Sequence, residues 1–99
     1  MQINIQYVHM PTSESLNGII TKKLEKMEQK FNWIIKAEVF IKQEHSASGD
    51  IKICEIELSA PGPRIFASTK TDDFEKAVAG TIKDLNRQLE KRKHSFASH

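Results

Sequence analysis

The sequence has a single cysteine, Cys54, and no apolar run long enough to cross a membrane. One cysteine can form neither an intramolecular disulfide nor a thiolate metal cluster. A membrane-spanning helix needs about 20 predominantly apolar residues, and the polar start MQINIQ does not have the pattern of a secretory signal peptide. These absences predict a cytoplasmic protein without a membrane partner.

Residue combinations that support metal binding or catalysis are also missing. The four histidines form no HxxxH pair, and no CxxC motif is present, so we expect neither a bound metal nor another cofactor. No nucleophile or acid–base pair stands at a spacing that indicates a catalytic site. Cys54 falls in the middle of a predicted strand, on its inward face, where a free cysteine usually belongs to the core. We therefore predict that the protein is not an enzyme and has no small-molecule substrate.

Aromatic residues make up only 7% of the chain, and their positions do not suit base stacking. The outward positions of the predicted strands lack the paired aromatics with which RNP-type sheets stack RNA bases. Phe66, on the last predicted strand, is interpreted as a packing residue, and Trp33 as a lid on the core. Any contact with RNA is therefore expected to run through the helices.

The composition that is present is typical of one folded domain. With 99 residues, of which 38% are hydrophobic and 28% charged, the chain has room for a single two-layer core. We expect one domain over residues 1–99, with a folded core at about 1–93 and a flexible tail at 94–99.

Hydrophobic periodicity predicts four strands and two helices. Alternation predicts the strands, as where Ile35, Ala37, Val39 and Ile41 share one parity. Apolar residues at steps of three and four predict two amphipathic helices. The predicted segments are, in order, a strand at 3–8, a helix at about 13–31, a strand within 32–44, a polar loop at 45–50, a strand at 51–60, a tight PGP connection at 61–63, a strand at 64–71 and a helix at about 73–93.

This order predicts an α+β fold, a single two-layer domain with the elements β-α-β-β-β-α. Short connections favour an antiparallel meander of the second, third and fourth strands. The first strand joins them through a helical crossover, which places that helix on one face of the sheet. The second helix must cover the same face to bury its own apolar stripe. We expect a four-stranded sheet with two helices side by side on one face.

The charges are sorted, although the net charge is only +2. On a helical wheel, Lys23, Lys26 and Lys30 share one flank of the first helix, with Lys22 further round. The second helix carries one row with almost no acid, formed by Lys76, Gly80, Lys83, Arg87 and Lys91. We expect the two rows to form a positive surface with a shallow groove between the helices, which suits the phosphate backbone of a nucleic acid.

Ordinary solvation is the alternative explanation of these rows. Lysine rows on exposed helices are most often surface decoration, and cations near a helix C-terminus gain a few tenths of a kcal/mol from the helix dipole. The stretch DLNRQLEKRKH at 84–94 continues past the last inward residue, Leu89, with Arg92, Lys93 and His94. We expect this end to bury little, to project toward RNA and to become fully ordered only on binding.

The stretch STKTDDFEKAVAGTIKDLNRQLEKRK at 68–93 resembles the signature region of the ribosome hibernation-promoting factor family, also called ribosome-associated inhibitor or sigma-54 modulation proteins. The matching residues of this region are Ala67, Ser68, Asp73, Ala77, Val78, Leu85, Arg87, Gln88, Leu89, Lys91 and Lys93. In the first helix, KKLEKMEQKF is similar to the family's Lys-Leu-x-Lys-Leu-Glu-x-x-Phe. The residues in place there are Lys23, Leu24, Lys26, Glu28 and Phe31. The resemblance covers essentially the whole chain.

The resemblance implies a double-stranded-RNA-binding-like fold and a stress or hibernation factor that represses translation. Its partner would be ribosomal RNA of the small ribosomal subunit, in the channel where messenger and transfer RNA sit. The rRNA contacts carried over by position are Lys23, Lys26, Arg87, Lys91 and Lys93. The helical wheel adds Lys22, Lys30, Lys76, Lys83 and Arg92. We expect a monomer when the protein is off the ribosome.

The chain departs from the family pattern at three positions of the second helix. The family commonly has Tyr where Glu75 stands, Asp where Ala79 stands and Lys where Asp84 stands, with Lys83 displaced by one residue. The chain ends at His99 without the carboxy-terminal dimerisation domain of long members or the acidic tail of the inhibitor type. It therefore resembles the short form.

Two other functions compete with ribosome binding. One is a protein-interaction module that modulates a transcription regulator, as the sigma-54 label suggests. The other is a phosphate-processing enzyme with a ferredoxin-like fold, which would need a nucleophile or an acid–base pair in a cleft. Co-sedimentation with ribosomes at low and high salt separates ribosome binding from regulator binding.

Overall fold

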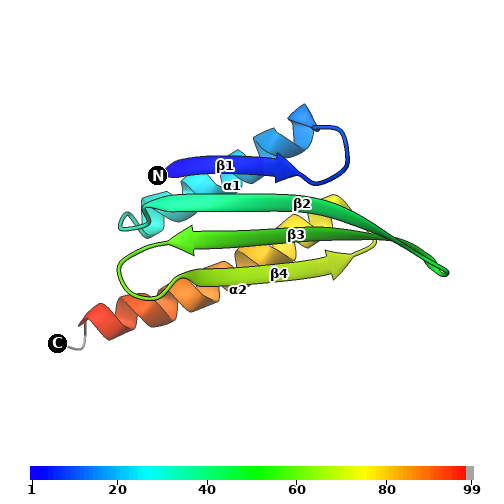
Figure 1. Cartoon of the computed structure of the whole chain (residues 1–99). Helices are drawn as coiled ribbons and strands as arrows, with labels where there is room; N and C mark the ends of the chain where they lie inside the picture. The colour runs from blue at the N-terminus through cyan, green and yellow to red at the C-terminus, as the bar shows by residue number, and fades with distance from the viewer. Residues whose placement is uncertain (98–99) are drawn as a thin grey trace.

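The computed structural model describes residues 1–97 and contains a single mixed sheet with two helices. The elements are β1 (Gln2–Tyr7), α1 (Glu14–Lys30), β2 (Lys36–Ser46), β3 (Gly49–Ser59), β4 (Ile65–Thr71) and α2 (Phe74–Ala97). The strands lie in the order β1-β2-β3-β4, with β1 parallel to β2 and the other pairs antiparallel. Both helices cover the same face of the sheet (Figure 1). The predicted fold class, element order and meander are confirmed.

The core lies between the sheet and the two helices, because every element turns its apolar side to the same layer. In β1 and β2, Ile3 and Ile5 stand in register with Ala37 and Val39. The helices contribute their stripes, and the fully buried large side chains include Phe31, Ile20, Leu24, Ile41, Ile56, Leu58, Leu85, Leu89, Val39 and Val78. Full burial of one such side chain stabilises the fold by about 1.5–3 kcal/mol.

Both helices begin at a residue whose side chain caps the helix. The Ser13 hydroxyl oxygen accepts from the backbone N–H of Leu16 at 3.2 Å. In α2, Asp73 Oδ1 accepts from the backbone N–H groups of Glu75 and Lys76 at 2.7 and 3.3 Å. These contacts satisfy backbone donors that have no partner inside a helix.

The polar loop predicted at 45–50 is wrong, because β2 and β3 continue through it. Ser46 stands opposite Gly49, so only Ala47 and Ser48 separate the strands, and Gly49 has φ 127°. The two outer strands of the sheet end earlier. The last residue of β1 is Tyr7, which pairs with Ile41 of β2, and the last residue of β4 is Thr71, which pairs with Lys52 of β3. The tip of the hairpin therefore projects beyond the sheet as a two-stranded ribbon (Figure 1). No apolar alternation marks this ribbon, because neither face covers a core.

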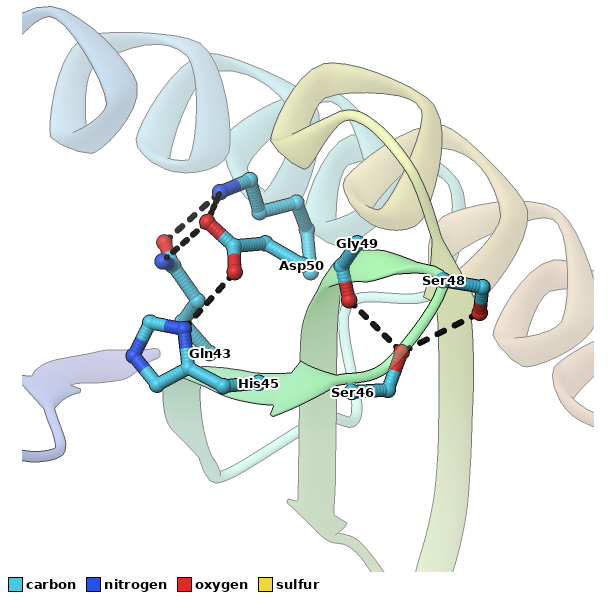
Figure 2. A network of polar contacts seen from close by, with 7 residues as sticks. Gln43, His45, Ser46, Ser48, Gly49 and Asp50 are labelled. Carbon is cyan, nitrogen blue, oxygen red and sulfur yellow. Dashed lines mark hydrogen bonds and ion pairs between the residues drawn. The ribbon is translucent and has the colours of Figure 1, made fainter.

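Polar side chains hold the projecting ribbon together, as Figure 2 shows. Asp50 Oδ1 lies 2.7 Å from His45 Nδ1, and Asp50 Oδ2 accepts from Gln43 Nε2 at 3.1 Å. Lys52 Nζ donates to Gln43 Oε1 at 2.7 Å. The hydrogen bond with His45 is the main cause that lowers the pKa of Asp50. An isolated two-stranded hairpin is marginal in water, so these contacts supply order that a core cannot.

The last helix is longer than predicted. Residues 94–97, which we assigned to a flexible tail, belong to α2, and residues 98–99 of that tail lie outside the described residues. Two contacts hold this end of the helix against the rest of the domain. The rings of Phe96 and Trp33 meet edge to face, with centroids 5.1 Å apart. Arg92 donates to the carbonyl oxygens of Pro61 and Pro63 at 2.7 and 2.8 Å. The expectation that this end becomes fully ordered only on binding RNA stays a prediction.

Three aromatic and apolar assignments can now be compared with the structure. Trp33 packs against the core, as predicted for a lid, and its ring also contacts Phe31. Phe66 is not a core residue, because it lies on the uncovered face of the sheet and is 47% exposed. Ile35 is 63% exposed, while Ile34 is buried in its place. The inward parity of the second strand therefore begins only at Ala37.

Candidate nucleic-acid interface

A hollow of about 550 Å³ lies between the two helices and carries three of the predicted cations. We call it the inter-helix hollow; it is lined by Lys23, Lys26, Met27, Gln29, Lys30, Ile82 and Asn86. The lysines stand three and four residues apart in α1, which places them on one flank of the helix. The predicted groove between the helices is therefore present. Its cations come from α1 alone, because α2 contributes Ile82 and Asn86.

The predicted basic row of α2 does not line the inter-helix hollow. Lys91 lines a different hollow of about 430 Å³ between α2 and the start of β4. We call it the β4-side hollow; it is lined by Arg64, Ile65, Gln88, Lys91, Arg92 and Ser95. The side of α2 that faces solvent, which we call its crest, carries the exposed side chains of Lys76, Lys83 and Arg87. The groove is therefore lined by the basic row of α1 alone, and whether both rows form one positive surface for a nucleic acid stays a prediction.

A close approach between α2 and β4 explains this rotation. A Cβ atom added at Gly80 would lie 2.9 Å from Thr69 Cγ2, so only glycine allows the helix to come this near. The next residue, Thr81, is fully buried, and its Oγ1 lies 2.9 Å from Thr69 Oγ1. The flank of α2 that carries Gly80 thus faces β4. Lys91 lies on the same flank of α2, which faces away from α1.

Several predicted contact residues already have partners within the protein. Lys30 Nζ lies 2.9 Å from a carboxylate oxygen of Glu90 and joins the two helices. Arg87 pairs with Asp84 at 2.9 Å, and Lys76 with Asp72 at 3.4 Å. These are exposed pairs, which typically contribute about 0–1 kcal/mol and exchange readily with other ions. The ammonium of Lys30 is also the main cause that lowers the pKa of Glu90.

Two further predicted contacts serve the fold. Arg92 is bound to the loop between β3 and β4 through the two proline carbonyls. Lys93 Nζ lies 6.0 Å from the centroid of the Phe31 ring, within cation–π range. Both side chains keep their charge in these contacts. They can therefore stabilise the protein and contribute to its positive potential.

The remaining predicted cations are unpaired. Within residues 1–97, no ion-pair or hydrogen-bond partner accompanies the side chains of five lysines: Lys22, Lys23, Lys26, Lys83 and Lys91. Of these, only Lys23 is half-buried, and the others are exposed. A lysine without a carboxylate partner presents its full charge to solvent. This set is the most basic feature of the helix side of the molecule.

The positions that depart from the family pattern have distinct surroundings. Asp84 neutralises part of the α2 crest, because its carboxylate holds the Arg87 guanidinium. Ala79 is exposed. Glu75 lines a third hollow, at the beginning of both helices, together with Tyr7, Met10, Ser13, Ser15, Leu16, Ile19, Asp73 and Phe74. None of the described residues that line this hollow is a lysine or an arginine.

The uncovered face of the sheet also carries cations, but most of them are paired. Lys36 and Glu38 lie 2.8 Å apart, and so do Lys42 and Glu55. Arg64 Nη1 donates to Glu57 Oε1 at 2.5 Å. Arg64 was not among the predicted contact residues. Its nearness to Arg92 depends on the fold, although the PGP stretch beside it signals a tight loop.

The side chain with nucleophilic chemistry is inaccessible. Cys54 is fully buried, and burial raises the pKa of its thiol to about 11. Only the thiolate is a strong nucleophile, so this group is inert in the folded protein at neutral pH. Within the described residues, no group of three or more His, Cys, Asp or Glu side chains could hold a metal ion. In the same part of the chain, neither helix has the length and apolarity of a membrane span.

Relatives with a curated description match the chain from end to end. It is 32% identical over 99 residues to the ribosome hibernation promoting factor of Escherichia coli strain K12 and to that of Salmonella typhimurium, and the match covers 100% of each protein. The corresponding factor of Klebsiella oxytoca is 30% identical, again over 100% of both chains.

Solved structures share the fold. A ribosomal subunit interface protein from Coxiella burnetii superposes with a TM-score of 0.85 at 24% identity, covering 95% of this chain and 99% of that one. The N-terminal domain of Thermus thermophilus Protein Y gives a TM-score of 0.77 at 16% identity, covering 92% and 98%. The family model described as "Sigma 54 modulation protein / S30EA ribosomal protein" matches residues 3–96. The chain belongs to this family.

Proposed function

We propose that this protein is a cytoplasmic, non-enzymatic ribosome hibernation factor. It binds the small ribosomal subunit in the channel for messenger and transfer RNA, and it represses translation by occupying that channel. The relatives described above carry the name ribosome hibernation promoting factor, which supports the ribosome as the partner. The family description also contains a sigma-54 modulation label, which keeps binding to a transcription regulator as a second candidate.

The observation that carries the proposal is the set of unpaired lysines on the helix side. Ribosomal RNA presents a dense array of phosphates, and a protein gains affinity when its cations displace the condensed counterions. A lysine that has no carboxylate partner within the described residues breaks no internal ion pair when it binds phosphate. Lys23 and Lys26 meet this condition and border the inter-helix hollow. We assign them the central phosphate contacts.

The paired cations take a secondary role. In the complex, a phosphate replaces Glu90 as the partner of Lys30, and another replaces Asp84 as the partner of Arg87. Breaking these ion pairs costs little free energy, because both pairs are exposed. Arg92 and Lys93 add positive potential while they remain bound to the fold. Contact through these side chains is sequence-independent, because lysine and arginine meet the backbone and read no base edge.

Co-sedimentation with vacant ribosomes over a series of salt concentrations tests the proposal. If the five unpaired lysines contact phosphate, log affinity should fall against log salt with a slope of about −3.5 to −4.5, from about 0.7–0.9 per contact. A slope near zero would contradict the proposed interface. Absence of ribosome binding at low salt, together with capture of a transcription regulator, would favour the second candidate.

A further inference from the structure

The β4-side hollow has the composition of an anion site. Among its six lining residues, three carry a positive charge and none carries a negative charge. Arg64 comes from the start of β4, whereas Lys91 and Arg92 come from α2, so the tertiary structure alone brings them together. The hollow lies on the flank of α2 that faces away from α1.

One cation of this hollow is fixed in place before any ligand binds. Arg92 donates from Nη1 to the carbonyl of Pro61 and from Nη2 to the carbonyl of Pro63. Gly62 lies between them with φ 96°, and a Cβ atom there would lie 2.9 Å from Arg92 Nη1. The loop therefore packs its backbone directly onto the guanidinium. A guanidinium has five N–H donors, and neutral carbonyls leave its charge uncompensated.

The other two cations are available. Lys91 has no ion-pair or hydrogen-bond partner within residues 1–97. Arg64 is held by Glu57, but its side chain is 76% exposed, so the pair is easily exchanged. Between them, Gln88 links α2 to β4, because its Nε2 donates to the carbonyl oxygen of Phe66 at 2.9 Å. One fixed arginine and two adjustable cations surround a space that opens to solvent.

We propose that the β4-side hollow binds a backbone phosphate of ribosomal RNA, as a second site separate from the inter-helix hollow. This inference rests on the proposed function and adds Arg64 to the interface. Lys83 and Arg87 lie on the exposed crest of α2 between the two hollows. An RNA backbone that crosses this crest meets cations on both sides of it. Arginine suits such a site, since its planar fork matches the oxygens of a phosphate.

The test uses the double variant Arg64→Gln, Lys91→Gln in the full chain. Neither residue takes part in the hydrogen bonds from Arg92 to the carbonyl oxygens of Pro61 and Pro63, so the fold should be retained. The matched control is Lys42→Gln, Lys70→Gln on the uncovered sheet face. The two double variants are matched. Each removes one cation that is paired with a glutamate of β3: Arg64 in the test variant and Lys42 in the control. Each also removes one lysine without a partner in residues 1–97: Lys91 in the test variant and Lys70 in the control.

Binding to vacant ribosomes is measured by co-sedimentation at several salt concentrations. We expect the Arg64→Gln, Lys91→Gln variant to bind about tenfold more weakly than the wild type, with a salt slope shallower by about 1.4–1.8 for two lost contacts. The control should stay within about twofold of the wild type with an unchanged slope. Thermal unfolding of all three proteins verifies that folding is equal.

The outcomes separate this inference from the proposed function. If the wild type does not bind ribosomes, the proposed function fails and the second site fails with it. If the wild type binds with the expected salt slope, but the slope of the test variant is shallower by only about 0.7–0.9, the loss of Lys91 alone explains it. Arg64 then makes no contact, the second site is overturned and the proposed function stands. A larger loss for the control than for the test variant would place the RNA on the sheet face instead.

Discussion

The helix side and the uncovered sheet face both carry cations, yet they differ in how those cations are compensated. On the sheet face, Lys36, Lys42 and Arg64 each have a glutamate within 2.8 Å, and Lys70 is the exception. On the helix side, five lysines have no partner within residues 1–97. The helix side has more cations in total, and a second property separates the two faces. Pairing distinguishes them, because an ion pair cancels most of the potential that would attract phosphate.

Backbone geometry explains part of this difference. In an antiparallel sheet, diagonal neighbours on adjacent strands lie within reach of long side chains. Lys42 and Glu55 are such a pair, since Phe40 is the register partner of Glu55. On a helix, only residues three or four apart meet. Lys26 has Lys23 three residues before it and Lys30 four residues after it, so the basic flank of α1 has few acids within reach.

Removal of the helix-side charges should give the largest effect. We expect the quadruple variant Lys23→Ala, Lys26→Ala, Arg87→Ala, Lys91→Ala to lose at least about 100-fold in ribosome affinity at low salt. Stability should change little, because substitutions of surface side chains usually stay within about 0.5 kcal/mol each. Co-sedimentation and circular dichroism measure the two quantities. Unfolding of the variant would show that these side chains support the core.

Truncation after Glu90 should have an intermediate effect on two properties at once. It removes the hydrogen bonds of Arg92 with the loop between β3 and β4, and it removes the ring contact between Phe96 and Trp33. We therefore expect the free energy of unfolding to fall by about 1–3 kcal/mol, in addition to weaker ribosome binding. For a domain of this size, each kcal/mol lowers the melting temperature by about 4–8 °C.

Phe96→Ala is the control that separates the two roles of this helix end. It removes the contact with Trp33 but no charge, so it should lower the melting temperature by several degrees and leave ribosome affinity within about twofold. Differential scanning calorimetry and co-sedimentation measure these values. Equal affinity of the truncated and full chains at the same salt would show that residues 91–97 serve the fold alone.

Removal of the glutamate partners of the sheet-face cations should have the smallest effect. It tests directly whether pairing causes the difference between the two faces. Glu55→Gln with Glu57→Gln removes the partners of Lys42 and Arg64 without adding a cation. If pairing weakens the attraction of these cations for RNA, nonspecific affinity for single-stranded RNA should rise by about two- to fivefold at low salt, and the gain should disappear at high salt. Fluorescence anisotropy with a labelled oligonucleotide measures it. An unchanged affinity would mean that geometry, and not pairing, excludes RNA from the sheet.

Much of the fold and part of the site could be predicted from local patterns. Alternation placed Ala37, Val39 and Ile41 in the core, and helical steps placed Leu85 and Leu89 there. The same steps placed Lys23 with Lys26 on one flank, because neighbours on a helix are decided within one or two turns. The loop at 45–50 was missed, since a ribbon stabilised by polar side chains leaves no apolar signal. The continuation of α2 to residue 97 was missed, since Phe96 finds its partner Trp33 far away in the sequence.

The sequence by itself determined the element order, the inward face of nearly every element and the cluster of lysines on α1. Each of these follows from periodicity and capping, which act over a few residues. Only the tertiary structure decided where the cations of α2 point. The rotation of that helix depends on its close approach to β4 at Gly80 and on the burial of Thr81, and both require a distant strand. That rotation turns Lys91 away from α1 and brings it beside Arg64, a neighbour that no local pattern relates to it.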